Sequence, residues 1–214
     1  MIIKSNQEEI QNYLSDASNF KGFCDKVYLP ESTSELFEIL KETNSKSIPV
    51  TISGNGTGLT GARVPQGGIV ISTEKLNKII EINKQQMFAI VESGVLLADL
   101  LARLKEEKLL YPPDPTEKNC FIGGTIATNA SGEKTFRYGS TRDYILEIEI
   151  ILADSDIINL KRGEVIANGN LLQVKSSKGN VYDFKLPNII LPVTKNAAGY
   201  YCNNDMDAID LFIG

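Results

Sequence analysis

The chain contains no histidine and no tryptophan. Histidine is the side chain that proteins use most often as a general base and as a metal ligand, so its absence excludes Ser-His-Asp and Cys-His mechanisms. A metal site would have to use carboxylates alone, and the Asp and Glu residues are scattered rather than grouped at ligand spacing. The sequence therefore predicts no metal site.

Cysteine is also scarce, and no run of apolar residues is long. Cys24, Cys120 and Cys202 are widely spaced and form no C-x-x-C pair, so neither a disulfide framework nor a zinc knuckle is indicated. Residues 1–20 are polar where a secretory signal needs an apolar core, and no later run reaches membrane-spanning length. We expect reduced thiols, no transmembrane segment and a cytoplasmic location.

The chain lacks the basic runs that nucleic-acid binding requires. Its formal net charge is −5, and its Lys and Arg residues are not clustered, so the sequence predicts no nucleic-acid partner. With 214 residues, 42% of them hydrophobic, it can bury the core of one large domain or of two small ones.

Capping and periodicity predict the elements of the first half. Ser32 and Glu35 form an S-x-x-E pattern before apolar residues at helical spacing, so we expect a helix over about 33–44 that leads into the strand IPVTI. Segment 94–108 predicts an amphipathic helix, and GGIVIS and QMFAIVESG predict strands, which together make two βα units. KLNKIIEINKQQ is expected to be a solvated turn. The leucines expected to face the core are Leu97, Leu100, Leu101 and Leu104.

The second half reads as strand-rich. YILEIEIILADSDIINLKRG has the pattern of a hairpin, VYDFKL that of a strand, and LPNIILPVTKNAAGYYCNND that of an ordered loop. The sequence thus predicts an α+β protein, with a small βα lobe over about 1–85 and a larger strand-rich lobe over about 86–214.

The segment VTISGNGTGLTGARVPQGGIVIS contains a G-x-G-x-x-G match at Gly56, Gly58 and Gly61. A dinucleotide-binding crossover needs a helix after the third glycine, and ARVPQGG is too short and too rich in Pro and Gly to form one, which leaves Glu74 without its ribose-binding context. No Gly-Lys-Ser or Gly-Lys-Thr completes a Walker loop. Two interpretations remain: a nest of backbone N–H groups that binds an anion, or a tight turn.

A second stretch, PPDPTEKNCFIGGTIATNASG over 112–132, joins a rigid proline turn to paired glycines and small residues. Small side chains allow a flat ligand to lie against the backbone. The same pattern also fits a helix packed closely on a neighbour.

Together with FRYGSTRDYILEIEIILAD over 136–154, these stretches closely resemble the FAD-linked oxidases of the vanillyl-alcohol oxidase and p-cresol methylhydroxylase (PCMH) superfamily. The similarity is greatest to its D-lactate dehydrogenase and glycolate oxidase branch. The glycine loop, P-P-D-P, the G-G-x-[IV]-A-T-N-A motif and Y-G-x-T-R-D-Y occur here in the family's order and spacing, over nearly the whole chain. The resemblance implies a PCMH-type FAD-binding fold of two α/β lobes.

The resemblance also implies a set of cofactor-binding residues, whereas no catalytic residue is identified. The first loop is expected around the FAD pyrophosphate, the proline turn near the isoalloxazine or ribityl end, and the second glycine motif along the rest of the cofactor. A further glycine, Gly94, is expected near the adenosine. The full set is Gly54, Asn55, Gly56, Thr57, Gly58, Thr60, Gly94, Pro113, Asp114, Gly123, Gly124, Thr128, Asn129 and Ala130.

Several positions depart from the family pattern. Asn55 replaces the usual middle glycine, which a left-handed backbone would tolerate, and Ser131 stands where glycine is common. Thr57 and the lack of histidine exclude the histidyl flavin link of some members, so non-covalent FAD is expected. Cys120 lies near the site of a cysteinyl link in certain relatives, and a plain buried thiol is the alternative.

Two residues of the last motif have alternative roles. Arg142 can approach a substrate carboxylate, or it can form a structural pair with Asp143 or another acid. Tyr138 can contact the cofactor or pack in the core.

By resemblance, the full-length enzyme oxidises a D-2-hydroxy acid to a 2-oxo acid and passes electrons through FAD to an unidentified acceptor. Relatives continue beyond the position of Gly214 into a substrate-binding domain, so we expect this chain to be the flavin-binding portion of a longer enzyme, engineered or naturally truncated, and inactive alone. The alternative is a non-catalytic flavin-binding or assembly subunit of a multi-subunit oxidase. A reductase of an enolpyruvyl sugar nucleotide shares the architecture, but its motifs differ.

Overall fold

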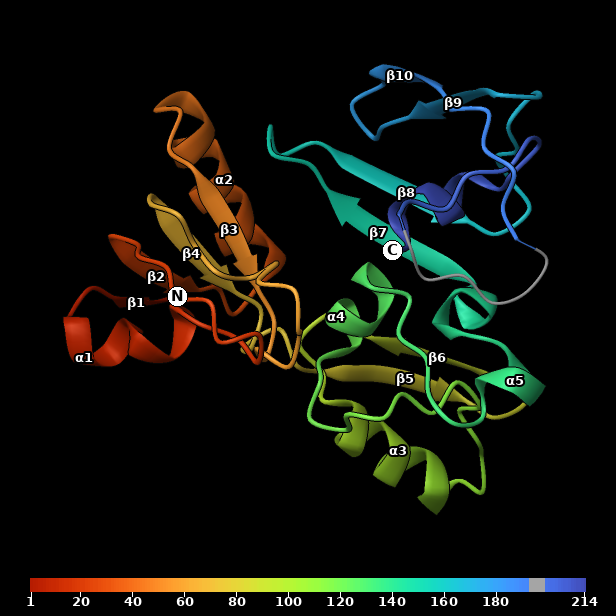
Figure 1. Ribbon diagram of the computed structural model, residues 1–214, viewed down its shortest axis with the longest axis horizontal. Coiled ribbons are helices and arrows are strands. Elements are labelled where there is room, and N and C mark those ends of the chain that lie inside the picture. Colours follow the sequence, from red (N-terminus) through yellow and green to blue (C-terminus); the bar gives the residue numbers. More distant parts are fainter. Residues whose placement is uncertain (193–198) are drawn as a thin grey trace.

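The computed structural model describes residues 1–192 and 199–214, and its strands form one four-stranded sheet and three hairpins (Figure 1). In the sheet, a central strand of four buried residues pairs in parallel with both neighbours, and an antiparallel strand covers one edge. Burial of the central strand on both faces is typical of parallel sheets. The order across the sheet is β1 (Ile2–Lys4), β2 (Lys26–Leu29), β4 (Ile69–Ser72) and β3 (Val50–Ser53).

Helix α2 (Thr33–Ser45) covers one face of this sheet. Ser32 caps its N-terminus as expected, because Ser32 Oγ accepts the N–H of Glu35 at 3.3 Å. The Glu35 carboxylate accepts the N–H of Glu31 at 2.8 Å rather than that of Ser32, so only half of the expected capping box forms. The predicted helix over about 33–44 is therefore confirmed. The other face carries two short helices, α1 (Gln7–Ile10) and the 3₁₀ helix η1 (Gln11–Tyr13), which the sequence analysis missed.

The hairpin of β5 (Ile79–Asn83) and β6 (Phe88–Val91) packs on helix α3 (Leu97–Glu106). Leu97, Leu100 and Leu104 are buried, with Leu101 partly buried beside them, so the leucine stripe is core as predicted. The prediction of a solvated turn for KLNKIIEINKQQ is wrong, because Ile79 and Ile82 pack against this cluster. The second βα unit is accordingly an antiparallel hairpin followed by a helix.

The last third of the chain contains two more hairpins, as the strand-rich pattern predicts. β7 (Glu147–Ile151) and β8 (Ile157–Lys161) form the predicted hairpin, and β10 (Val181–Lys185) is the predicted strand VYDFKL, paired with β9 (Leu171–Lys175). Part of the predicted ordered loop, 193–198, lies outside the described residues. The remaining helices are α4 (Ile122–Ala127), α5 (Thr135–Tyr138), η2 (Thr141–Tyr144) and η3 (Ala208–Phe212).

A buried charge cluster ties η2 to η3. Arg142 Nη1 lies 3.1 Å from Asp210 Oδ1, and Arg162 Nη2 lies 2.9 Å from the same oxygen. Arg142 also donates to the carbonyl oxygens of Asp210 and Ile213, both at 2.9 Å. Removal of the carboxylate that pairs with a buried arginine leaves an uncompensated charge.

We therefore expect Asp210→Ala to lower the free energy of unfolding by about 3–5 kcal/mol, measured by urea denaturation. Glu106→Ala is the matched control: it breaks the ion pair with Arg103, in which both side chains are more than half exposed. That control should cost less than about 1 kcal/mol. Equal and small losses in both variants would contradict a stabilising role for the Asp210 cluster.

Candidate functional site

The first glycine run begins where β3 ends, at the carboxyl end of the parallel strands. In open sheets with parallel strands, ligands bind at that end. Residues 54–68, all of which the structure describes, join β3 to β4 without a helix. The sequence-based rejection of a dinucleotide-binding crossover therefore agrees with the structure.

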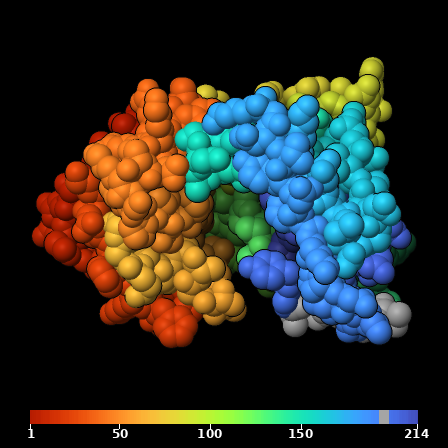
Figure 2. All heavy atoms as spheres, turned by 90° about the horizontal axis from the view of Figure 1, so that it is seen from above, coloured from red at the N-terminus to blue at the C-terminus, as the bar shows by residue number. Residues whose placement is uncertain are grey.

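The structure brings the first glycine run against the second glycine motif. Asn55 Nδ2 donates to the carbonyl oxygen of Asn119 at 2.6 Å, and a Cβ on Gly54 would lie 3.9 Å from the Phe121 ring. Phe121 immediately precedes α4, which begins the second motif. In the space-filling view, a hollow separates the orange β3 region from the blue C-terminal region, and green atoms of the α4 region lie at its floor (Figure 2).

Three of the predicted cofactor glycines leave open space where a side chain would project. No heavy atom lies within 4 Å of a Cβ placed on Gly124, and the nearest atoms to a Cβ on Gly54 or Gly58 are 3.9 Å away. Nothing in the packing of the described residues requires glycine at these positions. Bare backbone facing open space is what the close approach of a ligand needs.

At the other three predicted glycines, protein atoms occupy the space into which a side chain would project. A Cβ on Gly94 would lie 1.9 Å from the carbonyl oxygen of Thr73, and one on Gly123 would lie 2.8 Å from Ser93 Cβ. A Cβ on Gly56 would lie 2.5 Å from the Arg63 guanidinium carbon. Packing alone accounts for these glycines, and contact between Gly94 and a cofactor stays a prediction.

Asn55 is accommodated differently from the expectation. Its φ is not positive, so the left-handed backbone that was expected to tolerate it is not present. Any L-residue fits this conformation, and the side-chain amide is used for the bond to Asn119. Besides Gly56, with φ 74°, the predicted site residues that do have a left-handed backbone are Asp114, with φ 47°, and Asn129, with φ 45°.

The proline turn lies against the loop that follows α4. A Cβ on Gly132 would lie 1.9 Å from the carbonyl oxygen of Asp114, so glycine is required at that contact. The Asp114 carboxylate pairs with Lys118 and, at 3.0 Å, with Lys134. The hydrogen bond from Lys118 is the main cause that lowers the pKa of Asp114, and the hydrogen bond from Lys134 lowers it further. The carboxylate therefore stays ionised. Pro113 is buried beside it.

The small residues at the end of α4 form a hydrogen-bonded corner with η2. Asn129 Oδ1 accepts the N–H of Arg142 at 2.9 Å, and the carbonyl of Ala130 accepts the Thr141 hydroxyl at 2.7 Å. Thr128 Oγ1 donates to the carbonyl of Gly124 at 2.9 Å. The second glycine motif is thus a packed helix, and its exposed face is formed by Gly124, Ala127 and Thr128. In the first loop, Thr57 is half-buried and Thr60 exposed.

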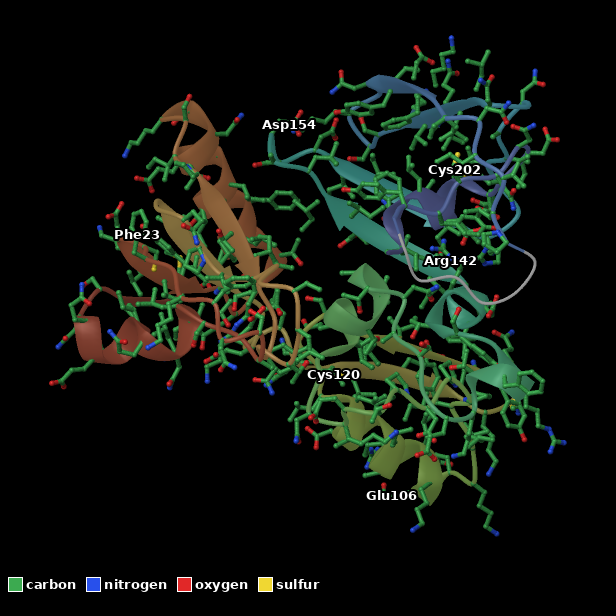
Figure 3. The ribbon with its side chains drawn as sticks, viewed as in Figure 1. Phe23, Glu106, Cys120, Arg142, Asp154 and Cys202 are labelled. Atoms are coloured by element: carbon green, nitrogen blue, oxygen red, sulfur yellow. The ribbon has the colours of Figure 1, made fainter. Side chains whose placement is uncertain are left out.

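The structure gives the contacts of the three residues for which the sequence left alternatives open. Arg142 forms the structural pair with another acid, Asp210, and its guanidinium lies 4.0 Å from the Tyr201 ring centre (Figure 3). Cys120 is a buried thiol whose Sγ donates to the Glu117 carbonyl at 2.8 Å, and burial raises its pKa. Tyr138 is 36% exposed, so it does not pack in the core.

One residue beside the glycine loop, Arg63, could not be predicted from the sequence. Its guanidinium donates to the carbonyl oxygen of Gly54 at 2.8 Å and fills the space beside Gly56. The only local signal in the sequence is that Arg63 is a cation two residues after Gly61. Its partners in the segment 12–15 are too distant in sequence to be inferred.

Other kinds of site were sought across the described residues. No group of three or more His, Cys, Asp or Glu side chains is arranged there to hold a metal ion, and no described helix is long and apolar enough to cross a membrane. Two open depressions on the surface of the described part, about 390 and 370 Å³, are lined by none of the predicted cofactor residues. The hollow beside α4 is open to the surface as well (Figure 2).

Comparisons with known proteins agree with this geometry. A D-lactate dehydrogenase of Anaerostipes hadrus is 44% identical over 130 residues, 60% of this chain and 27% of that protein. A D-lactate dehydrogenase of Archaeoglobus fulgidus is 42% identical over 145 residues, 67% of this chain and 32% of that protein. The matched region therefore spans about a third or less of these relatives.

The fold agrees with a solved structure as well. An alkyldihydroxyacetonephosphate synthase superimposes with a TM-score of 0.67 at 18% identity, covering 87% of this chain and 41% of that one. The expected α+β, PCMH-type FAD-binding fold is confirmed. The model of the family described as FAD binding domain matches residues 24–161, more than half of the chain. The chain belongs to the FAD-binding domain family.

Proposed function

We propose that this chain is the FAD-binding portion of an oxidoreductase that oxidises a D-2-hydroxy acid, of the lactate or glycolate type, to a 2-oxo acid. The observation that carries the proposal is the meeting of two glycine motifs beside an open hollow, where a Cβ at Gly54, Gly58 or Gly124 would meet no protein atom closer than 3.9 Å. The substrate class rests on relatives named D-lactate dehydrogenase and glycolate oxidase subunit.

The residues present fit an elongated anionic cofactor. The loop 54–58, with Thr60 behind it, would hold the pyrophosphate through backbone N–H groups, because glycines leave these groups accessible. Gly124 and Thr128 to Ala130 would line the middle of the cofactor, and the turn at Pro113 and Asp114 its ring end. A bound flavin supplies the acceptor for the hydride, while the protein supplies position and exclusion of water.

Three finer statements belong to the same proposal. FAD is held without a covalent bond, which the engaged Cys120 thiol and the absence of histidine support. The location is cytoplasmic, which the three unpaired cysteines support. The chain divides into lobes of about 1–85 and about 86–214, with the β5–β6 hairpin spanning that boundary.

The direct test is an absorbance scan of the purified chain after incubation with FAD and removal of the excess. We expect a flavin spectrum, release of intact FAD on heating, and no bleaching by D-lactate or glycolate, because the matched region is about a third of its relatives. No detectable FAD binding by the folded chain would refute the proposal. Bleaching by either acid would show that these residues suffice for turnover and would contradict the assignment as a portion.

A substitution at Gly124 separates ligand binding from folding. Gly124→Leu adds a side chain that meets no protein atom at its Cβ, and leucine favours a helix over glycine by about 0.5–1 kcal/mol. We expect the FAD-free variant to be at least as stable as the wild type in thermal unfolding. The FAD dissociation constant should rise at least about tenfold, because the side chain occupies the proposed cofactor space.

Glu106→Leu serves as the control for this substitution, since it adds the same side chain on α3, far from α4 (Figure 3). Its FAD affinity should match that of the wild type. Wild-type affinity in Gly124→Leu would mean that the cofactor does not approach this face of α4.

A further inference from the structure

Arg63 lies beside the glycine loop, and its guanidinium group bonds to two separate segments. Nη1 donates to the Gly54 carbonyl at 2.8 Å and to Ser53 Oγ at 3.2 Å. Nε and Nη2 donate to the Ser15 carbonyl at 3.0 and 2.8 Å, and Nη2 also donates to the Asn12 carbonyl. A planar, five-donor guanidinium can hold several fixed acceptors at once, so Arg63 joins the loop to residues 12–15.

The shape of the loop depends on this side chain. Gly56 has a φ of +74°, and the place of its missing Cβ is taken by the Arg63 guanidinium, 2.5 Å away. The Gly56 carbonyl accepts the N–H of Ala17 at 3.0 Å, so the loop is bonded to the same N-terminal segment at a second point. Glycine at position 56 is therefore required by Arg63, whatever ligand the loop receives.

The segment 12–18 is a fixed support for these bonds. Tyr13 is 6% exposed, and its hydroxyl donates to Glu74 Oε2 at 2.9 Å, just after the end of β4. The chain at Gly22 lies so close to Pro65 that a Cβ on Gly22 would be 1.9 Å from the Pro65 carbonyl oxygen. This support lies outside the family-matched region, which begins at residue 24.

The bonds of Arg63 also affect which backbone groups of the loop, carbonyl or N–H, are free to face a ligand. Three of its acceptors are backbone carbonyls, among them that of Gly54 inside the loop. A carbonyl held by a cation does not face an incoming anion, and backbone N–H groups are then left to do so. Arg63 is half-buried, so its bonds are partly shielded from water.

We propose that Arg63 is a positioning residue for the cofactor, which fixes the glycine loop against residues 12–18 in the shape that receives the FAD pyrophosphate. This proposal rests on the proposed function and extends it to a residue outside the glycine motifs.

The test uses the whole chain with Arg63→Lys, which keeps the charge and loses the planar fork, and Arg63→Met, which loses both. The control is Arg162→Met, which removes an arginine paired with Asp210 far from the loop. Two quantities are measured: the FAD dissociation constant by fluorescence titration, and amide hydrogen exchange of Ala17, whose N–H is bonded to the Gly56 carbonyl, in the FAD-free chain.

We expect both Arg63 variants to raise the dissociation constant at least about tenfold. They should also speed exchange of the Ala17 amide at least about fivefold, because a loop released from Arg63 opens the bond to Gly56 more often. Arg162→Met should lower stability while leaving both quantities within about twofold of the wild type. If Arg63→Met does not fold, Arg63→Lys decides alone. A dissociation constant within about twofold of the wild type in Arg63→Lys overturns the proposal.

The two proposals fail in different ways. A wild-type chain that binds no FAD refutes the proposed function. Exchange of the Ala17 amide then still shows whether Arg63 fixes the shape of the loop, because that measurement needs no cofactor. Unchanged exchange in Arg63→Lys overturns the role of Arg63 even where the wild type binds FAD.

Discussion

The site depends on the close approach of backbone to backbone where three segments cross. Gly94 lies against the carbonyls of Thr73 and Leu76, and Gly123 lies against Ser93, at distances that no Cβ could occupy. These contacts press the end of β4, the start of α3 and the start of α4 together. With that junction closed, the glycine loop after β3 reaches residues 119–121, and the hollow forms beside it (Figure 2). A side chain at either glycine would push the two motifs apart.

The six predicted cofactor glycines therefore have two distinct physical roles. Gly56, Gly94 and Gly123 serve the packing of the protein, whereas Gly54, Gly58 and Gly124 leave space that the described residues do not use. A sequence pattern cannot separate these roles, since both require the same absent side chain. The distinction matters for experiments, because substitutions in the first group alter the fold before they alter any ligand contact.

Local signals in the sequence were sufficient where an element is stabilised by its own residues. The capping box and apolar spacing predicted α2, the leucine stripe predicted α3, and alternation around Asp-Ser-Asp predicted the β7–β8 hairpin. The strand at Ile79–Asn83 was missed because its apolar residues are recognisable only once α3 covers them. The contacts of Arg63 with residues 12–15, of Asn55 with Asn119 and of Arg142 with Asp210 could not be inferred for a similar reason, since these partners lie 48 or more positions apart in the chain. The motif order predicted a site, and only the structure showed which of the predicted residues contact each other.

The central claim is that two separate glycine motifs bind the same cofactor. Amide hydrogen exchange of the chain with and without FAD tests it most directly, since each motif reports on its own protection. We predict that FAD slows exchange both in residues 54–58 and in residues 122–130, with the same dependence on FAD concentration. Protection of only one of the two motifs, or of neither, would contradict the account.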